Sequence, residues 1–242
     1  MRATRASHDR PPPPVTDQLA LDFPLCPSLR REDYLVTPAN AFALSMIEGW
    51  RGWPLGKALL VGPEGSGKSH LAAIWAELAG AVHLSAAALT EELIPGLVTR
   101  PLVLEDADRL ASRTSEEALL HLHNLMAERE MPLLLTARTP PRNWRLSVPD
   151  LASRMEGTTL FRLEPPDDEL LRGVLAKLFA DRQLVVHGAI MDWLAARMTR
   201  SLATAGRVVA DLDARALAEM APVSRQMVAE WLERDLQGDL DI

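Results

Sequence analysis

Residues 62–69 read Gly-Pro-Glu-Gly-Ser-Gly-Lys-Ser and fit the pattern G-x-x-x-x-G-K-[ST] of a phosphate-binding P-loop. Glycines let the backbone fold round an anion with its N–H groups pointing inward, and the helix that follows adds a favourable dipole. We expect Lys68 to reach the β- and γ-phosphates of a nucleotide and the Ser69 hydroxyl to ligate Mg²⁺. The residues assigned to this cradle are Gly62, Pro63, Glu64, Gly65, Ser66, Gly67, Lys68 and Ser69.

A chance glycine-rich turn is the alternative explanation of this stretch. The chain has lysines only at positions 57, 68 and 177, so composition alone gives a match with odds on the order of one in a thousand. The apolar residues 58–61 lead into the loop and the apolar-rich residues 70–79 follow it, which is the strand, loop and helix context of the motif. The sequence therefore predicts nucleotide binding, without indicating which nucleotide is bound or whether it is hydrolysed.

Two acids, Glu105 and Asp106, end the apolar run that begins at Leu102. In an open α/β sheet the site lies at the carboxyl ends of the strands, where one acid could hold Mg²⁺ and the other could orient or deprotonate a water. A strand followed by an acidic turn is the alternative, and the P-loop about 35 residues upstream favours the functional interpretation. Thr136 ends the buried run 132–136, where a polar residue could contact the γ-phosphate.

Apolar patterning predicts an α/β core followed by a small, all-helical lid. The expected strands are 58–61, 81–84, 102–106, 132–136 and 158–163, forming a parallel sheet between helices. The expected helices are 39–49, 70–79, 91–97 (or a turn) and 115–129 in the core, then 168–181, 189–199, 202–220 and 223–236 in the lid. We place a tail at 1–23, the core at 24–164 and the lid at 165–242.

Several single residues carry expectations of their own. Trp50 and Trp53 are expected to be packing residues rather than a platform for an adenine base, and His121 and His123 are expected at the surface or at an edge. Arg154 follows Pro149 in what reads as a loop before the fifth strand. Arg200 begins the third lid helix and could reach back to the nucleotide.

The bulk composition restricts the classes of partner. A net charge of −7 and a pI near 5.4 argue against a broad phosphate-binding surface for DNA. The one cysteine, Cys26, rules out an internal disulfide and fits a reducing cytosol. The chain has neither an apolar run long enough to span a bilayer nor a signal-peptide pattern, so we expect a cytoplasmic protein that does not enter membranes.

The N-terminal tail carries a short apolar cluster. Residues 1–16 read as disordered, because four prolines at 11–14 favour an extended spacer and nothing there can bury a core. The cluster that follows consists of Gln18, Leu19, Leu21 and Phe23. These residues either fold back on the domain or form a linear motif, and their order is similar to that of short peptides that bind the bacterial sliding clamp, the β subunit of DNA polymerase III.

The motifs together resemble those of AAA+ ATPases, and more specifically of the DnaA family. Residues 32–43 resemble the box before the P-loop of that family, 62–71 (with His70 after Ser69) its P-loop, 133–141 its sensor 1 strand, and 151–154 its arginine-finger box. The resemblance covers roughly residues 30–220. It implies a P-loop AAA+ core with a lid, ATP or ADP with Mg²⁺ as ligand, contacts to it from His70 and Arg200, and Arg154 as a catalytic arginine.

Two departures point to the Hda-like regulatory inactivators of DnaA. The chain ends where DnaA continues into a helix-turn-helix DNA reader, so no sequence-specific DNA binding is expected, and it carries the clamp-like tail. This resemblance implies an adaptor that binds the sliding clamp and stimulates hydrolysis of DnaA-bound ATP, with Arg154 acting in trans and with self-association as a further option. Glu105-Asp106 differs from the usual Asp-Glu pair, which implies weak intrinsic ATPase activity. A helicase loader of the DnaC/IstB type and a truncated DnaA-type initiator are the alternatives.

Overall fold

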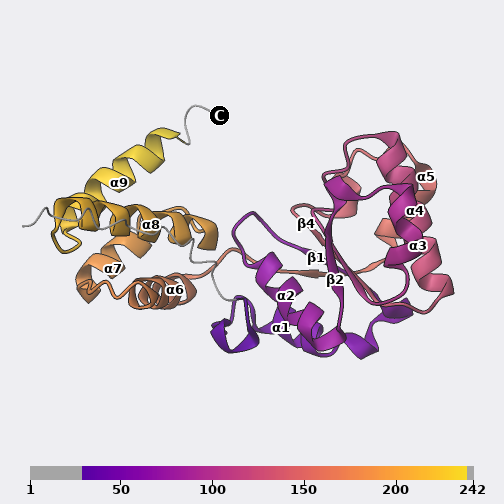
Figure 1. Ribbon diagram of the computed structural model, residues 1–242, viewed down its shortest axis with the longest axis horizontal. Helices are drawn as coiled ribbons and strands as arrows, with labels where there is room; N and C mark the ends of the chain where they lie inside the picture. Colours follow the sequence, from indigo (N-terminus) through magenta and orange to yellow (C-terminus); the bar gives the residue numbers. More distant parts are fainter. Residues whose placement is uncertain (1–28, 239–242) are drawn as a thin grey trace, which may run out of the picture.

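The computed structural model describes residues 29–238, in which a layered α/β core is followed by a separate bundle of helices (Figure 1). The strands are β1 (Lys57–Val61), β2 (Val82–Ser85), β3 (Leu102–Glu105), β4 (Leu133–Ala137) and β5 (Thr159–Arg162). The helices are α1 (Ala41–Glu48), α2 (Lys68–Ala79), α3 (Ile94–Leu97), α4 (Arg113–Glu128), α5 (Pro149–Glu156), α6 (Asp168–Asp181), α7 (Gly188–Ala195), α8 (Leu202–Glu219) and α9 (Arg225–Gly238). Short 3₁₀ turns lie at Arg31–Asp33, Trp50–Gly52, Pro54–Gly56, Ala86–Ala88, Glu91–Leu93 and Pro141–Asn143.

The five strands form one parallel sheet in the order β2-β3-β4-β1-β5, which confirms the predicted fold class. Val61 at the end of β1 pairs with Ala137 on β4 and with Arg162 on β5, and Glu105 at the end of β3 pairs with Ser85 on β2. Because all the strands run the same way, their carboxyl ends share one edge. The loop after Val61 therefore lies beside the residues that follow β3 and β4.

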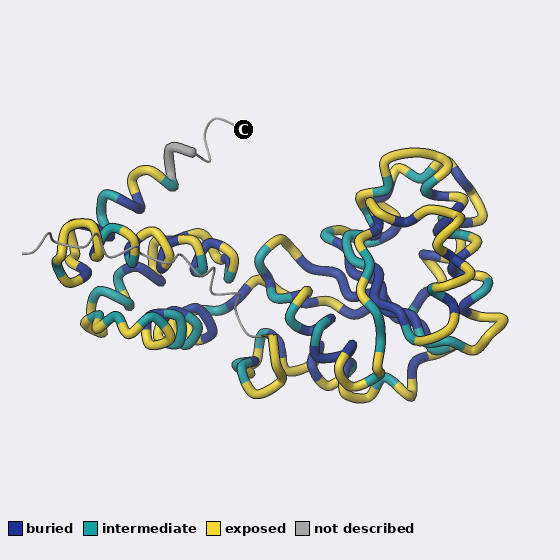
Figure 2. Tube along the Cα trace, in the orientation of Figure 1, coloured by how far each residue is buried: buried dark blue, intermediate teal, exposed yellow. Residues whose placement is uncertain are grey.

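Both faces of the sheet are covered by helices, which explains why the strands are continuous apolar runs. Side chains alternate along a strand, so Leu59 and Val61 pack in the cluster that contains α4 and α5, whereas Ala58 and Leu60 pack in the cluster that contains α1 and α2. Figure 2 shows the strands as the buried centre of the core. Trp53, 5% exposed, stacks on Trp75 with ring centroids 5.3 Å apart, as expected of a packing residue.

The lid has its own apolar centre. Helices α6–α9 enclose a cluster whose buried members run from Leu171 to Leu232. Polar contacts join the lid to the core. The Lys177 Nζ lies 2.9 Å from the Asp33 carboxylate, and the backbone N–H of Leu202 donates to the Gly65 carbonyl at 2.7 Å. The start of α8 therefore rests on the P-loop. None of the helices among residues 29–238 combines the length and the apolar character that crossing a bilayer requires.

The structure corrects two local predictions. The expected loop around Arg154 is helix α5, which begins at Pro149; proline is well tolerated at a first helical position because its missing N–H would have no helical partner there. His123 is not at the surface but only 6% exposed. In both cases packing on the sheet decides the outcome: α5 packs against α4, and His123 on α4 faces the buried Lys57 of β1.

His123 lies beside another buried polar residue, Lys57, which begins β1 and is 3% exposed. The Lys57 Nζ donates to the His123 carbonyl at 2.6 Å and lies 3.3 Å from its ring nitrogens. Burial, together with the nearby Arg154 guanidinium, lowers the pKa of Lys57 to about 8. Burial, with Lys57 and Arg154 nearby, also lowers the pKa of His123 to about 4. The imidazole is therefore neutral in the folded protein at neutral pH.

We predict that His123 makes stability fall in weak acid. The His123 side chain has a pKa near 6.5 in the unfolded chain, whereas in the folded protein its pKa is about 4. The stability from neutral His123 is thus fully present above pH 6.5 and is lost as the pH falls towards 4, by roughly 3 kcal/mol in all. Urea unfolding across this range should show a flatter pH dependence for His123→Gln than for the wild type. His121→Gln, at an exposed neighbour, should keep the wild-type slope; equal slopes for all three proteins would contradict the prediction.

Candidate phosphate-binding site

The P-loop connects β1 to α2 and adopts a conformation that two glycines make accessible. Gly65 has φ +71° and Gly67, the N-cap of α2, has φ +103°, both in the left-handed region that side chains disfavour. A Cβ at Gly65 would overlap the Ser201 hydroxyl of the lid and would lie 3.2 Å from the Ala203 nitrogen. The loop therefore stays close to the lid only because it lacks side chains at this point.

Lys68 lies folded into the loop that it follows. Its side chain is 8% exposed, and its Nζ donates to the carbonyls of Gly62 and Pro63 at 2.7 and 2.8 Å. Burial lowers the pKa of Lys68, while the carboxylates of Asp106, Asp108 and Glu64 act in the opposite direction. The ammonium group is thus a desolvated cation at the position where the motif predicts the β/γ-phosphates.

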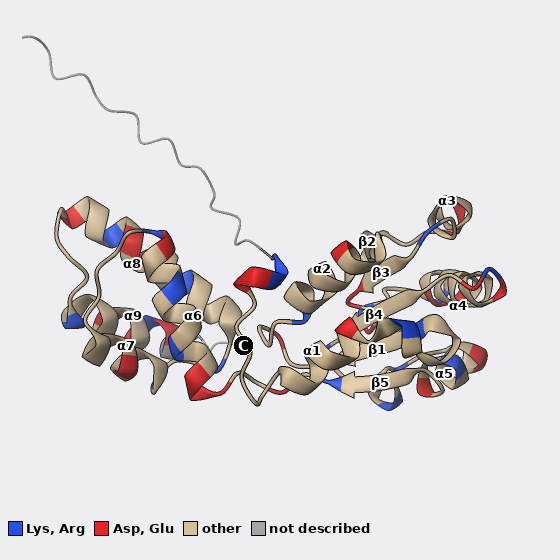
Figure 3. Cartoon of the chain, turned by 90° about the horizontal axis from the view of Figure 1, so that it is seen from below, with Lys and Arg blue, Asp and Glu red and all other residues tan. Residues whose placement is uncertain are grey.

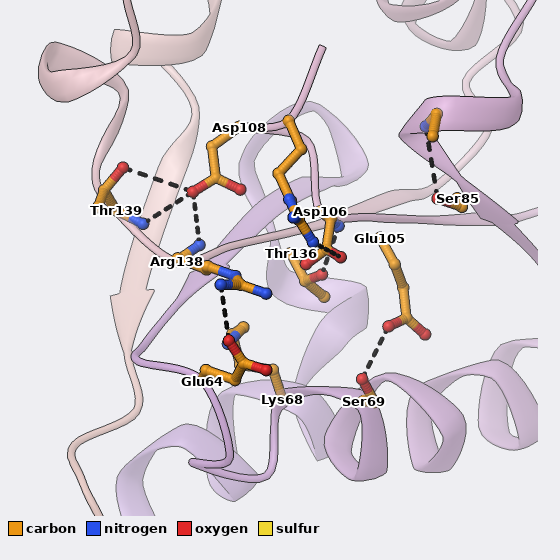
Figure 4. Close-up of polar contacts among 12 residues, drawn as sticks. Glu64, Lys68, Ser69, Ser85, Glu105, Asp106, Asp108, Thr136, Arg138 and Thr139 are labelled. Carbon is orange, nitrogen blue, oxygen red and sulfur yellow. Dashed lines mark hydrogen bonds and ion pairs between the residues drawn. The ribbon is translucent and has the colours of Figure 1, made fainter. Parts of the chain in front are cut away.

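Ser69 and Glu105, the two residues expected to ligate Mg²⁺, contact each other at the sheet edge. The Ser69 hydroxyl donates to Glu105 Oε2 at 2.8 Å (Figure 4). His83 Nδ1 on β2 lies 3.2 Å from Glu105 Oε1. Among residues 29–238 no cluster of three or more His, Cys, Asp or Glu side chains could hold a metal by itself. This donor set fits Mg²⁺, which takes one or two protein oxygens and completes its octahedron with phosphate and water.

Asp106 and Thr136 also come together, from the ends of β3 and β4. The Asp106 backbone N–H donates to the Thr136 hydroxyl at 3.1 Å, and Asp106 adopts φ +55°, which places its carboxylate off the strand direction. That carboxylate lies 3.9 Å from Arg109 and is 39% exposed. An exposed acid at this edge could orient a water, the role that the sequence suggested for it.

Two further residues at the site were missed as functional candidates, namely Asp108 and Arg138. The Asp108 Oδ2 accepts backbone N–H bonds from Arg138 at 2.8 Å and Thr139 at 3.1 Å, and its Oδ1 is buried without a partner. Arg138 NH1 in turn lies 2.6 Å from the Glu64 carboxylate of the P-loop. The run Glu-Asp-Ala-Asp at 105–108 was the available signal, since an acid two residues after Asp106 reaches the neighbouring strand end.

The side chains of Arg200 and His70 contact segments other than the P-loop. Arg200 lies two residues before the start of α8 and precedes its N-cap, Ser201. The Arg200 guanidinium pairs with Asp168 at 2.7 Å and donates to the Pro166 carbonyl at 3.3 Å. No hydrogen bond in the described part of the chain links the Arg200 side chain to the loop. The His70 ring lies 2.9 Å from the Arg30 carbonyl and edge-on to Tyr34. Gln18, Leu19, Leu21 and Phe23 lie outside the described residues.

Arg154 lies near the opposite end of the sheet from the P-loop. It is exposed on α5 and is close enough to Lys57, the first residue of β1, to influence its pKa. The P-loop follows the last residue of β1, a distance of about 16 Å for a strand of this length. Figures 1 and 3 place α5 on the side of the core away from the lid. Within residues 29–238 Arg154 forms no side-chain ion pair, neither with Asp150 nor with Glu156.

A comparison of sequences relates the chain to DnaA. It is 24% identical over 136 residues to the chromosomal replication initiator protein DnaA of Cutibacterium acnes (strain DSM 16379 / KPA171202), a match that covers 56% of this chain. The chain is homologous to DnaA. The matched region spans about a quarter (27%) of the length of that relative, and no family model matches the chain.

Solved structures show that the fold is that of an AAA+ domain. Domain III of the Thermotoga maritima replication initiation protein DnaA superimposes with a TM-score of 0.74 and 17% identity, covering 88% of this chain and 99% of that one. AMPPCP-bound DnaA from Aquifex aeolicus gives 0.58 and 18%, covering 69% and 60%. The Thermotoga maritima RuvB Holliday junction branch migration motor gives 0.66 and 21%, covering 85% and 72%. The fold is thus shared by DnaA and RuvB, whereas the sequence match is to DnaA.

We predict that Gly65→Ala destabilises the protein through the lid contact. The substitution places a Cβ in a left-handed conformation and against Ser201, so unfolding free energy should fall by about 2 kcal/mol. Chemical denaturation measures this value, with Gly52→Ala as a control because its Cβ would meet no atom within 4 Å. Adding Ser201→Gly should recover part of the loss. If the changes in unfolding free energy caused by Gly65→Ala and by Ser201→Gly are simply additive in the double variant, the P-loop does not contact the lid as described.

Proposed function

We propose that this protein is a nucleotide-bound AAA+ adaptor that binds the sliding clamp and stimulates hydrolysis of DnaA-bound ATP, and so acts as a negative regulator of replication initiation. The observation that carries the proposal is the position of Arg154. It is exposed, forms no ion pair within residues 29–238, and lies about a strand length from the chain's own P-loop. An arginine so placed can serve a nucleotide only on another molecule. Homology to DnaA makes DnaA–ATP the partner of first choice.

The chain's own nucleotide is ATP or ADP with Mg²⁺ in this proposal. The buried Lys68 ammonium, the inward-folded loop and the Ser69–Glu105 oxygen pair supply the cation, the N–H cradle and the metal ligands. Glu105 is already engaged by Ser69 and His83, and Asp106 lies beside Arg109. With the acids so held, we propose that the nucleotide serves mainly as a structural ligand and that intrinsic hydrolysis is weak.

Arg154 suits a catalytic role in trans for physical reasons. A guanidinium remains charged at all relevant pH values and donates in a planar fork that matches phosphate oxygens. Lys57 and His123 lie near Arg154, and burial contributes to lowering their pKa values to about 8 and about 4, respectively. Carboxylates of the same helix, Asp150 and Glu156, do not neutralise it. The charge of Arg154 is therefore available to a partner's phosphates.

Arg154→Ala should bind nucleotide and clamp normally but fail to stimulate hydrolysis by DnaA. Arginines that act in trans on phosphoryl transfer contribute about 10³- to 10⁵-fold in rate in GTPase systems, so the loss should be large. Arg154→Lys should restore little, because it keeps the charge and loses the fork. Single-turnover hydrolysis of DnaA–ATP with clamp loaded on DNA is the measurement.

The matched control for this assay is Arg100→Ala, at an exposed arginine that also lacks a side-chain ion pair in the described region. It should stimulate like the wild type. Full stimulation by Arg154→Ala would remove the role in trans and leave a passive DnaA-binding protein. Stimulation of a second copy of this chain, in place of DnaA, would instead point to a homo-oligomeric ATPase.

The tail should provide clamp binding independently of the nucleotide site. Replacing Gln18, Leu19 and Phe23 by Ala should abolish binding to the sliding clamp, since apolar anchors that fill a groove and one directional hydrogen bond carry most of the affinity of such peptides. A pull-down with and without the tail measures the effect, and unchanged thermal unfolding and nucleotide affinity serve as controls. Undiminished clamp binding would show that these residues have another role.

A further inference from the structure

A buried carboxylate, that of Glu116, holds the start of the helix that carries Arg154. Glu116 lies in the first turn of α4 and is 7% exposed. Its Oε2 accepts the backbone N–H groups of Ser147 and Val148, both at 2.8 Å, and the Ser147 hydroxyl at 3.0 Å. Within residues 29–238 Glu116 forms no ion pair, so these hydrogen bonds are what offsets its removal from water.

Helix α5 has no cap of its own. Its N-cap residue is Val148, whose side chain cannot accept a hydrogen bond, and its first residue is Pro149, which has no N–H to donate. The helix has only eight residues, and helices of that length need tertiary contacts to be stable in water. Glu116 supplies, from the adjacent helix α4, the negative charge that favours a helix N-terminus (Figure 1).

The rotation of α5 about its own axis decides where Arg154 points. Leu151 and Met155, four residues apart on one face of α5, are buried in the apolar cluster to which α4 also contributes. Arg154 is exposed, and its backbone carbonyl accepts the Thr158 hydroxyl at 2.9 Å. The helix is therefore fixed at its start by Glu116 and beyond its end by Thr158, and the side chain of Arg154 leaves it between these two points.

We propose that Glu116 is a positioning residue for Arg154, an inference that rests on the proposed role of Arg154 in trans. Glu116 acts through α5 and does not itself touch a nucleotide. By fixing the start of the helix it holds the Arg154 guanidinium in one direction before a partner's phosphates approach. A guanidinium donates along directions set by its planar fork, so a displaced Arg154 keeps its charge but loses its hydrogen bonds to the phosphate.

Single-turnover hydrolysis of DnaA–ATP, with clamp loaded on DNA and increasing amounts of this protein, separates positioning from binding. Glu116→Ala should lower the maximal stimulated rate by about 10²-fold, as a misplacement of about 1 Å can do. The concentration for half-maximal stimulation should stay within about twofold of the wild type, because the loss concerns the rate and not the binding. Glu116→Gln keeps one acceptor oxygen without the charge and should retain an intermediate rate, about tenfold below the wild type.

The matched control is Glu117→Ala. Glu117 is the neighbouring acid on α4, is exposed and pairs with Arg113 on the same helix. This variant should stimulate hydrolysis like the wild type, since Glu117 forms no contact with the start of α5 among the ion pairs and hydrogen bonds of residues 29–238.

Amide hydrogen exchange of the full chain alone tests the anchor without DnaA. Glu116→Ala should speed exchange at residues 150–156 and leave exchange in the strands unchanged, because it loosens α5 and not the sheet. Circular dichroism checks that each variant is folded. If Glu116→Ala does not fold, the same two measurements on Glu116→Gln decide the question.

The outcomes separate this inference from the proposed function. If Arg154→Ala abolishes stimulation while both Glu116 variants keep the full maximal rate, the positioning role is overturned and the proposed function stands. Wild-type exchange in α5 of both variants, or a raised half-maximal concentration at an unchanged maximal rate, would also overturn it. If the wild type does not stimulate DnaA, the proposed function fails and the inference fails with it. A lower maximal rate at an unchanged half-maximal concentration, with faster exchange confined to α5, supports the proposal.

Discussion

A buried ammonium group, that of Lys68, is the constraint on which the site depends. Removing it from water is costly, and the structure offsets the cost with two loop carbonyls and with the nearby carboxylates of Asp106, Asp108 and Glu64. The carbonyls can converge on one nitrogen only because Gly65 and Gly67 adopt left-handed conformations. The acids can surround it only because parallel strands end at a common edge. The conformation of the loop, the position of the acids and the direction of the strands are therefore all needed to bury this one cation.

The lid is part of the same arrangement. The Leu202 N–H donates to the Gly65 carbonyl, and Lys177 on α6 pairs with Asp33, which precedes α1. Asp33 lies near His70, the residue after Ser69, whose ring contacts Tyr34 and the Arg30 carbonyl. The P-loop and the helix that follows it therefore contact both the start of α8 and residues 30–34.

Strong local patterns predicted most of the fold, and packing decided the rest. All five strands and the sheet edge carrying Lys68, Ser69, Glu105 and Thr136 followed from apolar runs and one motif. Helix α5 could not be foreseen, because eight residues that begin with proline carry a weak signal and gain their order from α4. Burial of His123 depends on Lys57, 66 residues away, and the Asp108–Arg138 contact spans 30 residues, so neither lies within reach of a local pattern.

The two ends of β1 serve different molecules in the proposed function, and this separation has a physical advantage. At the carboxyl end, acids surround Lys68 and favour a bound cation–phosphate complex. At the amino end, Lys57 and Arg154 form a positive region that only an approaching anion would compensate. An arginine placed near Lys68 would compete for the chain's own phosphates, whereas Arg154 lies near Lys57 at the other end of the strand. In the proposed function, the same strand thus holds the chain's own nucleotide at one end and places Arg154 for a partner's nucleotide at the other.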